Sequence, residues 1–244
     1  MYRYLAHPIE DIIWNYKGKT KVKCGGFQSE FDSTFGSQFR KVKRRLHSEY
    51  VILEDIIQEV TKNDVYYDIG AGLGLHTCLP AKKITQGKVI SVEPYGPNIE
   101  QLKKNVNLNQ LRNIEILKVA MFDSKGTVKF NEEYNSLSSN NDGVSVNTVA
   151  GDSLVARGEI PQPNVVKIDV EGSEPQVVEG LKESLKRKEC RALYCEVHLP
   201  STHRPSINNF GMNVDTFKKK LESYGFNLVI LKRRRREIFI KATK

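Results

Sequence analysis

The sequence has no long apolar segment and few cysteines, and each shortage excludes a class of protein. No run approaches the roughly 20 apolar residues of a membrane-spanning helix, and Glu10 and Asp11 interrupt the place where a signal peptide would have its apolar core. The four cysteines show no C-x-x-C spacing, so zinc is not expected and we predict reduced, mostly buried thiols (Cys24, Cys78, Cys190 and Cys195). The expectation is a cytoplasmic protein without a transmembrane segment.

Acidic residues are outnumbered by basic ones, 29 against 38, which gives a formal net charge of +9. This balance suits a polyanionic partner, although basic surfaces are common in cytosolic domains. A chain of 244 residues suffices for one sizeable domain. We predict an N-terminal extension over 1–47 and a catalytic domain over 48–244. The extension is expected to cap the sheet or, as the less favoured alternative, to cover the ligand site.

The most informative stretch is an apolar run, 65–69, that ends in a turn with glycine at alternate positions. Gly70, Gly72 and Gly74 allow a sharp turn and a close approach to a ligand. A dinucleotide fingerprint also needs glycine at the sixth position, where this chain has Leu75. Asp68 at the strand end would repel a pyrophosphate but attract a cation. The turn resembles the first motif of class I methyltransferases, whose cofactor, S-adenosylmethionine, is cationic and lacks phosphate.

Further side chains follow the next two predicted strands. Strand 88–93 ends at Glu93, followed by Pro94, and a carboxylate there is placed to accept the ribose hydroxyls of a nucleoside. Strand 114–120 ends at Ala120 and Met121, which would contact an adenine ring. Together with Asp68, Glu93 indicates a nucleoside site at neighbouring strand ends.

Alternating strands and helices predict an α/β fold with a doubly wound, mostly parallel seven-stranded sheet and an antiparallel last strand. Helices are expected over 48–57, 98–109 and 214–224. The last two strands, 226–231 and 237–241, form a hairpin with the basic tip 232–236. The polar stretch 131–143 is predicted as a loop that either reaches over the site or lies free on the surface.

Four ionisable side chains follow two later strands. Asp169 and Glu171 end the buried strand 164–168, and Glu196 and His198 end the strand 193–198. We predict that these side chains converge on the crevice and act as catalytic groups that orient or deprotonate an acceptor. A divalent metal at these carboxylates is an open alternative.

The stretch 166–174, Val-Lys-Ile-Asp-Val-Glu-Gly-Ser-Glu, and the following Val-Val-Glu-Gly-Leu resemble the signature of the FkbM family of methyltransferases. The resemblance covers roughly 48–241. It implies S-adenosylmethionine-dependent O-methylation of a hydroxyl or carboxyl on a sugar, lipid or other small molecule. Gly72 departs from the family, which usually has Asn there. The expected cofactor contacts are Asp68, Gly70, Ala71, Gly72, Leu75, Glu93, Pro94, Ala120, Met121 and Asp169.

Three alternatives remain at this point. The charge and the two basic runs, 41–45 and 232–236, suit an RNA methyltransferase, although no RNA-binding module is evident. A nicotinamide-dependent enzyme would use the same kind of sheet. A catalytically silent binding domain would keep the fold without turnover. The acceptor and the oligomeric state are not determined by the sequence.

Overall fold

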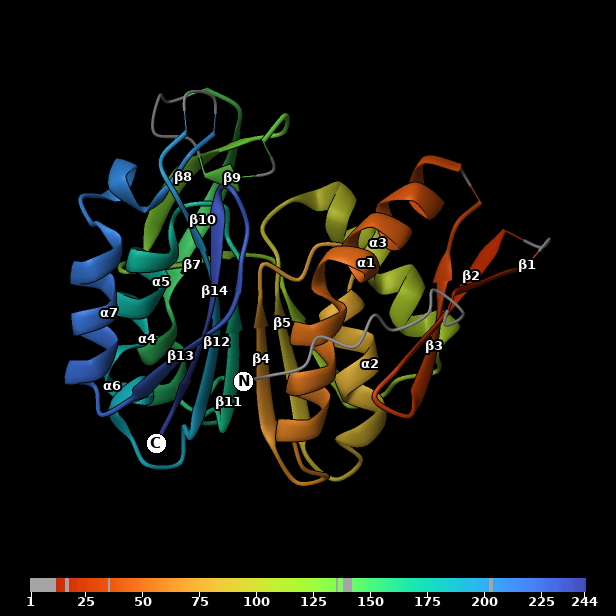
Figure 1. Ribbon diagram of the computed structural model, residues 1–244, viewed down its shortest axis with the longest axis horizontal. Coiled ribbons are helices and arrows are strands. Elements are labelled where there is room, and N and C mark those ends of the chain that lie inside the picture. Colours follow the sequence, from red (N-terminus) through yellow and green to blue (C-terminus); the bar gives the residue numbers. More distant parts are fainter. Residues whose placement is uncertain (1–11, 16–17, 35, 135, 138–141, 202–203) are drawn as a thin grey trace.

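The computed structural model describes residues 12–15, 18–34, 36–134, 136–137, 142–201 and 204–244 (Figure 1). Its centre is a seven-stranded sheet in the order β13-β14-β12-β11-β4-β5-β6. The strands are β4 (Val65–Ile69), β5 (Lys88–Val92), β6 (Ile114–Leu117), β11 (Val165–Ile168), β12 (Ala192–His198), β13 (Asn227–Arg233) and β14 (Glu237–Thr243). Neighbours from β12 to β6 pair in parallel, whereas β14 runs antiparallel to both β12 and β13. The predicted fold class is confirmed.

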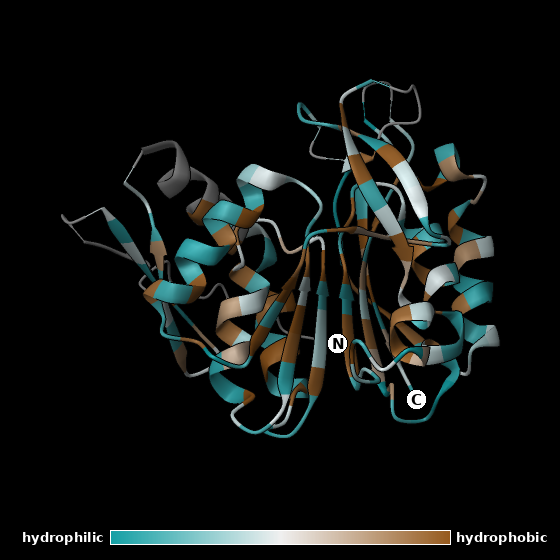
Figure 2. Ribbon diagram, turned by 180° about the vertical axis from the view of Figure 1, so that it is seen from behind, coloured by the Kyte–Doolittle hydropathy of each residue, from teal (hydrophilic) through white to brown (hydrophobic). Residues whose placement is uncertain are grey.

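Helices cover both faces of this sheet because its inner strands are apolar on both sides (Figure 2). Tyr66 of β4 packs on one face beside Ile52 and Ile56, while Tyr67 packs on the other beside Val177. One layer contains α1 (Gly36–Glu59), α2 (Leu75–Lys83) and α3 (Gly96–Leu108); the other contains α4 (Gly151–Ala156), α5 (Glu174–Gly180), α6 (Lys182–Lys186) and α7 (Val214–Ser223) (Figure 1). We expected Pro80 in the first turn of α2, but the helix begins at Leu75, so Pro80 lies in its interior.

A second sheet stands beyond the carboxyl ends of the parallel strands (Figure 1). It contains β7 (Ala120–Phe122), β10 (Val144–Ala150), β8 (Gly126–Asn131) and β9 (Ser136–Leu137), in that order. The predicted strand 114–120 was therefore wrong in its length. Of the predicted strand 114–120, only the part that forms β6 belongs to the central sheet. Ala120 pairs instead with Thr148 of β10 in the second sheet. The stretch 131–143, predicted as a loop, contributes the short β9, and residues 135 and 138–141 lie outside the described residues.

The N-terminal strands pack on the helices and do not line the cavity at the carboxyl ends of the parallel strands. A three-stranded antiparallel sheet of β1 (Ile12–Asn15), β2 (Lys19–Cys24) and β3 (Phe27–Asp32) lies beyond α2 and α3 (Figure 1). The backbone N–H groups of Glu30 and Asp32 donate to the side-chain oxygens of Asn109 and Asn105 on α3, each at 2.8 Å. The predicted boundary between 47 and 48 falls inside α1. Residues 1–11 and most side chains of the basic run 41–45 lie outside the described part.

The C-terminal hairpin of β13 and β14 forms as predicted, with the basic tip at its turn. Before it, the loop after β12 contains a 3-10 turn, Ile207–Phe210. All four cysteines are buried and free of disulfides. Among the described residues, no helix has the length and apolar character needed to cross a membrane.

Candidate active site

The glycine turn joins β4 to α2 and is fastened to the end of β5. Gly70, Gly72 and Gly74 all adopt positive φ angles, of 78°, 55° and 90°. The N–H groups of Gly70 and Ala71 both donate to the carbonyl of Val92, at 2.9 and 3.1 Å. The N–H of Gly72 donates to the Glu93 carboxylate at 2.9 Å. The turn and the acid at the end of the next strand therefore form one rigid unit.

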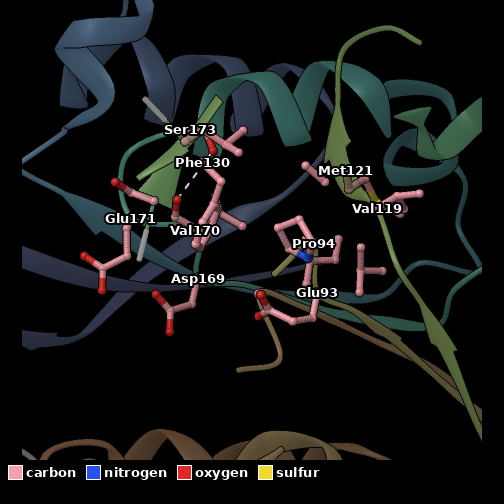
Figure 3. Close-up of a pocket in the computed structure, with 15 residues that line it drawn as sticks. Glu93, Pro94, Val119, Met121, Phe130, Asp169, Val170, Glu171 and Ser173 are labelled. Carbon is pink, nitrogen blue, oxygen red and sulfur yellow. Dashed lines mark hydrogen bonds between the residues drawn. The ribbon is translucent and has the colours of Figure 1, made fainter. Parts of the chain in front are cut away.

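An open cavity of about 490 Å³ lies at the carboxyl ends of β4, β5 and β11 (Figure 3). The second sheet closes one side of it with Phe130, Ser136 and Leu137. Glu93, Asp169 and Glu171 supply negative charge, and no lysine or arginine is among the lining residues. The lining residues are Ile69, Gly70, Val92, Glu93, Pro94, Val119, Ala120, Met121, Phe130, Ser136, Leu137, Asp169, Val170, Glu171 and Ser173. The cavity thus combines an apolar wall with acidic groups, which suits a cationic, partly apolar ligand.

Glu93 is held in place at the floor of this cavity. Its side chain is almost fully buried and accepts hydrogen bonds from Gly72 N–H, from Tyr95 N–H at 3.0 Å and from the Asn98 amide at 3.2 Å. Tyr95 is itself stacked on Phe130, with ring centroids 5.1 Å apart. The second sheet and the acid that follows β5 are therefore linked through one aromatic pair.

Asp68, which the sequence placed in the cofactor site, lies behind the turn and does not line the cavity. It is fully buried, accepts a 2.6 Å hydrogen bond from Thr77 of α2 and pairs with Lys167 at 3.0 Å. Lys167 also donates to the carbonyl of Gly70 at 3.1 Å. Side chains alternate between the faces of a strand, so Asp68 points away from the cavity that its neighbour Ile69 lines. Its contacts hold the turn from beneath.

The other predicted cofactor residues divide into two groups. Gly70, Glu93, Pro94, Ala120, Met121 and Asp169 line the cavity. Ala71, Gly72 and Leu75 do not: Ala71 and Leu75 pack into the apolar cluster between α1, α2 and β3, and Gly72 contributes through its bond to Glu93.

The predicted catalytic residues gather where β11 and β12 end. Asp169 and Glu171 line the cavity, while His198 lies directly behind Glu171, with Nε2 3.3 Å from its carboxylate. Glu196 lines a smaller neighbouring cavity of about 280 Å³, which Asp169 also borders. Burial raises the pKa of Glu196 well above its usual range, and the charge of Asp169 adds to the rise. The structure therefore brings all four together, but only two reach the larger cavity.

Donor atoms of Asp169, Glu196 and His198 lie within 4.8 Å of one another, a spacing that a metal ion could bridge. Each of these residues already faces a charged neighbour: Lys167 at 3.7 Å from Asp169, Arg234 at 3.7 Å from Glu196, and Glu174 at 2.7 Å from His198. We assign no metal to this cluster.

Several contributors were missed in the sequence. Glu174 was not among the predicted site residues, yet it is fully buried and hydrogen bonded to His198. It stands in the same short motif as Asp169 and Glu171, but the motif does not indicate its contact with His198. Phe130, Ser136 and Leu137 carry no such signal, since only the pairing of β8 with β9 brings them to the cavity.

Comparison with known proteins agrees with this geometry. The chain matches the Methyltransferase FkbM domain over residues 68–228, more than half of its length. The chain belongs to the FkbM methyltransferase family. A segment of 150 residues is 29% identical to the hexuronic acid methyltransferase AglP of Haloferax volcanii, covering 59% of this chain and 60% of that protein.

Solved structures show the same class I methyltransferase fold. The methyltransferase FkbM from Methylobacillus flagellatus superposes with a TM-score of 0.53 at 15% identity, over 75% of this chain and 44% of that one. A protein described as an rRNA methylase from Clostridium thermocellum superposes with a TM-score of 0.50 at 12% identity, over 79% and 93%. Both likenesses show the fold alone. This FkbM-family chain thus spans about 60% of the curated relative's length and less than half of the Methylobacillus protein.

Proposed function

We propose that this FkbM-family chain is an S-adenosylmethionine-dependent O-methyltransferase acting on a small-molecule acceptor. The observation that carries the proposal is the cavity at the carboxyl ends of β4 and β5, with three lining carboxylates and no lining cation. A dinucleotide would bring a pyrophosphate to this acidic surface and be repelled.

The residues present fit the cofactor. Glu93 would accept hydrogen bonds from ribose hydroxyls, and Ala120 with Met121 would contact the adenine ring. Asp169 would face the positive charge at the methionine end. Asp68 contributes indirectly, because Lys167 joins its carboxylate to the carbonyl of Gly70 in the turn.

The cofactor, when bound, supplies a methyl group already activated by its attachment to a sulfonium. The chain's own residues then have two tasks, to align the acceptor oxygen and to take its proton. Asp169 and Glu171 border the cavity on the side opposite Met121 (Figure 3). We place the acceptor oxygen beside these carboxylates, with Glu196 and His198 completing the charged group around them.

A sugar with an acidic group is the acceptor class that we favour. The name of the Haloferax relative, a hexuronic acid methyltransferase, supports a sugar acceptor. Arg204, half exposed, lies 3.9 Å from Glu171, and Arg233, Arg235 and Arg236 of the hairpin tip are exposed near the end of β12. These cations would attract an anionic acceptor. A cytoplasmic location goes with this proposal, since the cysteines are buried and unpaired.

Titration calorimetry with S-adenosylhomocysteine tests the cofactor assignment. Glu93→Ala should weaken binding by about ten- to hundredfold, the equivalent of one or two charged hydrogen bonds. Asp123→Ala is the matched control, because Asp123 is an exposed acid in the turn after β7 and lies outside the cavity. No heat of binding to the unaltered protein at millimolar ligand would refute the proposal.

A further inference from the structure

Three side chains form a line that runs from the core to the cavity. Glu174 Oε1 lies 2.7 Å from Nδ1 of His198, and Nε2 of the same ring lies 3.3 Å from Oε2 of Glu171. The exposed fraction of the side chain rises along this line, from 0% for Glu174 to 6% for His198 and 22% for Glu171. Only Glu171, at the outer end, lines the cavity.

Glu174 fixes the histidine ring. It lies in the first turn of α5, and the same Oε1 also accepts a hydrogen bond from the N–H of Gly172 at 2.9 Å. Nδ1 of His198 must carry a proton to donate to this carboxylate. The ring is therefore held with Nε2 directed at Glu171.

The backbone presents Glu171 in a conformation that glutamate rarely adopts. Its φ is +54°, and Gly172 follows with a φ of +113°. A Cβ at Gly172 would lie 2.8 Å from the N atom of Ser206, so the loop after β12 packs against this turn. A left-handed backbone is strained for glutamate, and such strain persists where surrounding contacts enforce it, often at functional sites.

Charge decides the protonation state of the ring. Glu171, Glu174, Asp169 and Glu196 face His198, while Lys167, Arg204 and Arg234 lie beyond these carboxylates. Burial alone would lower the pKa of His198, but Glu174 above all, with Glu171 and Asp169, raises that pKa well above 6.5. This rise favours the imidazolium form of the ring, in which neither nitrogen has a lone pair with which to accept a proton.

We propose that Glu171 is the general base of the methyl transfer, that the cationic His198 holds its carboxylate toward the acceptor, and that Glu174 is the positioning residue that anchors His198. This inference rests on the proposed function. As the acceptor oxygen bonds to the methyl carbon, the carbon–sulfur bond breaks with its electron pair going to sulfur. The hydroxyl proton passes to Glu171 and leaves through its exposed side.

Nitrogen-15 NMR of the histidine rings tests the arrangement without any acceptor. The expected result is that the His198 ring stays doubly protonated at pH 7 and that Glu174→Gln lowers the pKa of His198, because the carboxylate that raises it most is removed. The matched control is Glu179→Gln on the same helix, which removes a carboxylate that pairs with Lys220 and should leave His198 unchanged. A neutral His198 ring at pH 7, or an unchanged pKa in Glu174→Gln, would overturn the proposal.

Manganese added to the same sample separates this arrangement from a metal site. The imidazolium cannot ligate a metal, so the His198 signals should persist at submillimolar Mn²⁺ in the unaltered protein. Selective broadening of these signals, abolished by Glu196→Gln, would show a metal at Asp169, Glu196 and His198 and overturn the proposal.

Turnover with glucuronic acid as the probe acceptor tests the role of Glu171. Glu171→Gln should lower kcat by about 10²–10⁴-fold, a loss much larger than any change in its affinity for S-adenosylhomocysteine. Full turnover in this variant would refute the role of Glu171 as the base. Glu174→Gln should lower kcat with little change in KM and shift the alkaline limb of the pH profile to lower pH. If glucuronic acid is not turned over, the nitrogen-15 NMR titration of His198 still tests the positioning roles of His198 and Glu174. If S-adenosylhomocysteine does not bind, the proposed function fails separately.

Discussion

Gly70 brings the backbone of the glycine turn into contact with β11. A Cβ at this position would lie 1.8 Å from the carbonyl oxygen of Asp169, and its φ of +78° already disfavours other residues. Gly158 has a similar φ of +70° but open space around it. Gly158→Ala should therefore cost about 1–2 kcal/mol of unfolding free energy for the backbone conformation alone. Gly70→Ala should cost at least about 2 kcal/mol more, because it adds a backbone clash.

Urea denaturation of the two variants measures the difference, and calorimetry with S-adenosylhomocysteine measures its effect on the site. We expect Gly70→Ala to lose cofactor binding and Gly158→Ala to keep it. Equal stability losses in the two variants would show that the turn can move away from β11.

At single residues, the sequence identified the acids that follow the strands but not which face each one takes. Glu93 and Asp169, which the sequence indicated as site residues, border one cavity. Asp68 was placed there too, although the alternation that directs Ile69 into the cavity directs Asp68 toward α2 and Lys167. The position of Glu174 depends on α5 docking against β12, a tertiary contact that no local pattern reports.

Two asparagines of helix α3 and its C-cap bond to the N-terminal strands, and one of them also bonds to the glycine turn. Asn105 accepts from Asp32 N–H and donates to the carbonyl of Leu73 at 2.7 Å, whereas the side chain of Asn109 bonds to Glu30 of β3 and to the carbonyl of Asn105. Either substitution by alanine leaves buried backbone groups unsatisfied, so each should destabilise the protein by about 1–3 kcal/mol. Only Asn105→Ala should also weaken the binding of S-adenosylhomocysteine, because only Asn105 contacts the turn.

Asn107→Ala provides the control for this helix, since Asn107 is exposed on α3. Chemical denaturation and calorimetry of the three variants separate stability from binding. Equal cofactor affinity in Asn105→Ala and Asn109→Ala would mean that the N-terminal strands stabilise the fold without supporting the turn. The extension would then be a cap with no link to the site.

At the level of elements, the sequence predicted the helices and strands of the parallel core but not the change of sheet after β6. The stretch from Ile114 to Met121 is mostly apolar and contains no glycine or proline, so no turn signal marks the break after Leu117. The break arises because Ala120 pairs with Thr148, about thirty residues away in the chain. The hairpin of β13 and β14 was easier to predict from the sequence, because its two apolar runs flank a polar turn within a short stretch.

For the whole molecule, the order of strands and helices was enough to predict the layered sheet, because chain connectivity leaves few topologies for such a pattern. The charge of +9 was less informative. The net charge is compatible with a small-molecule enzyme, an RNA methyltransferase and a nicotinamide enzyme. The residues that line the cavity distinguish these three kinds of enzyme better than the net charge does.

The melting temperature of the whole chain distinguishes these ligands, because a ligand that binds only the folded state stabilises it by an amount that grows with the logarithm of its concentration divided by its Kd. S-adenosylhomocysteine at a hundred times its Kd should add about 2.7 kcal/mol, or about 5–11 °C for a domain of this size. NAD at the same concentration should leave the melting temperature unchanged, since the lining acids repel its pyrophosphate. The Glu93→Ala variant should lose most of the rise in melting temperature.

A larger rise with NAD than with S-adenosylhomocysteine would select the nicotinamide alternative. Strongly salt-dependent binding to bulk RNA would favour a nucleic-acid acceptor over a sugar.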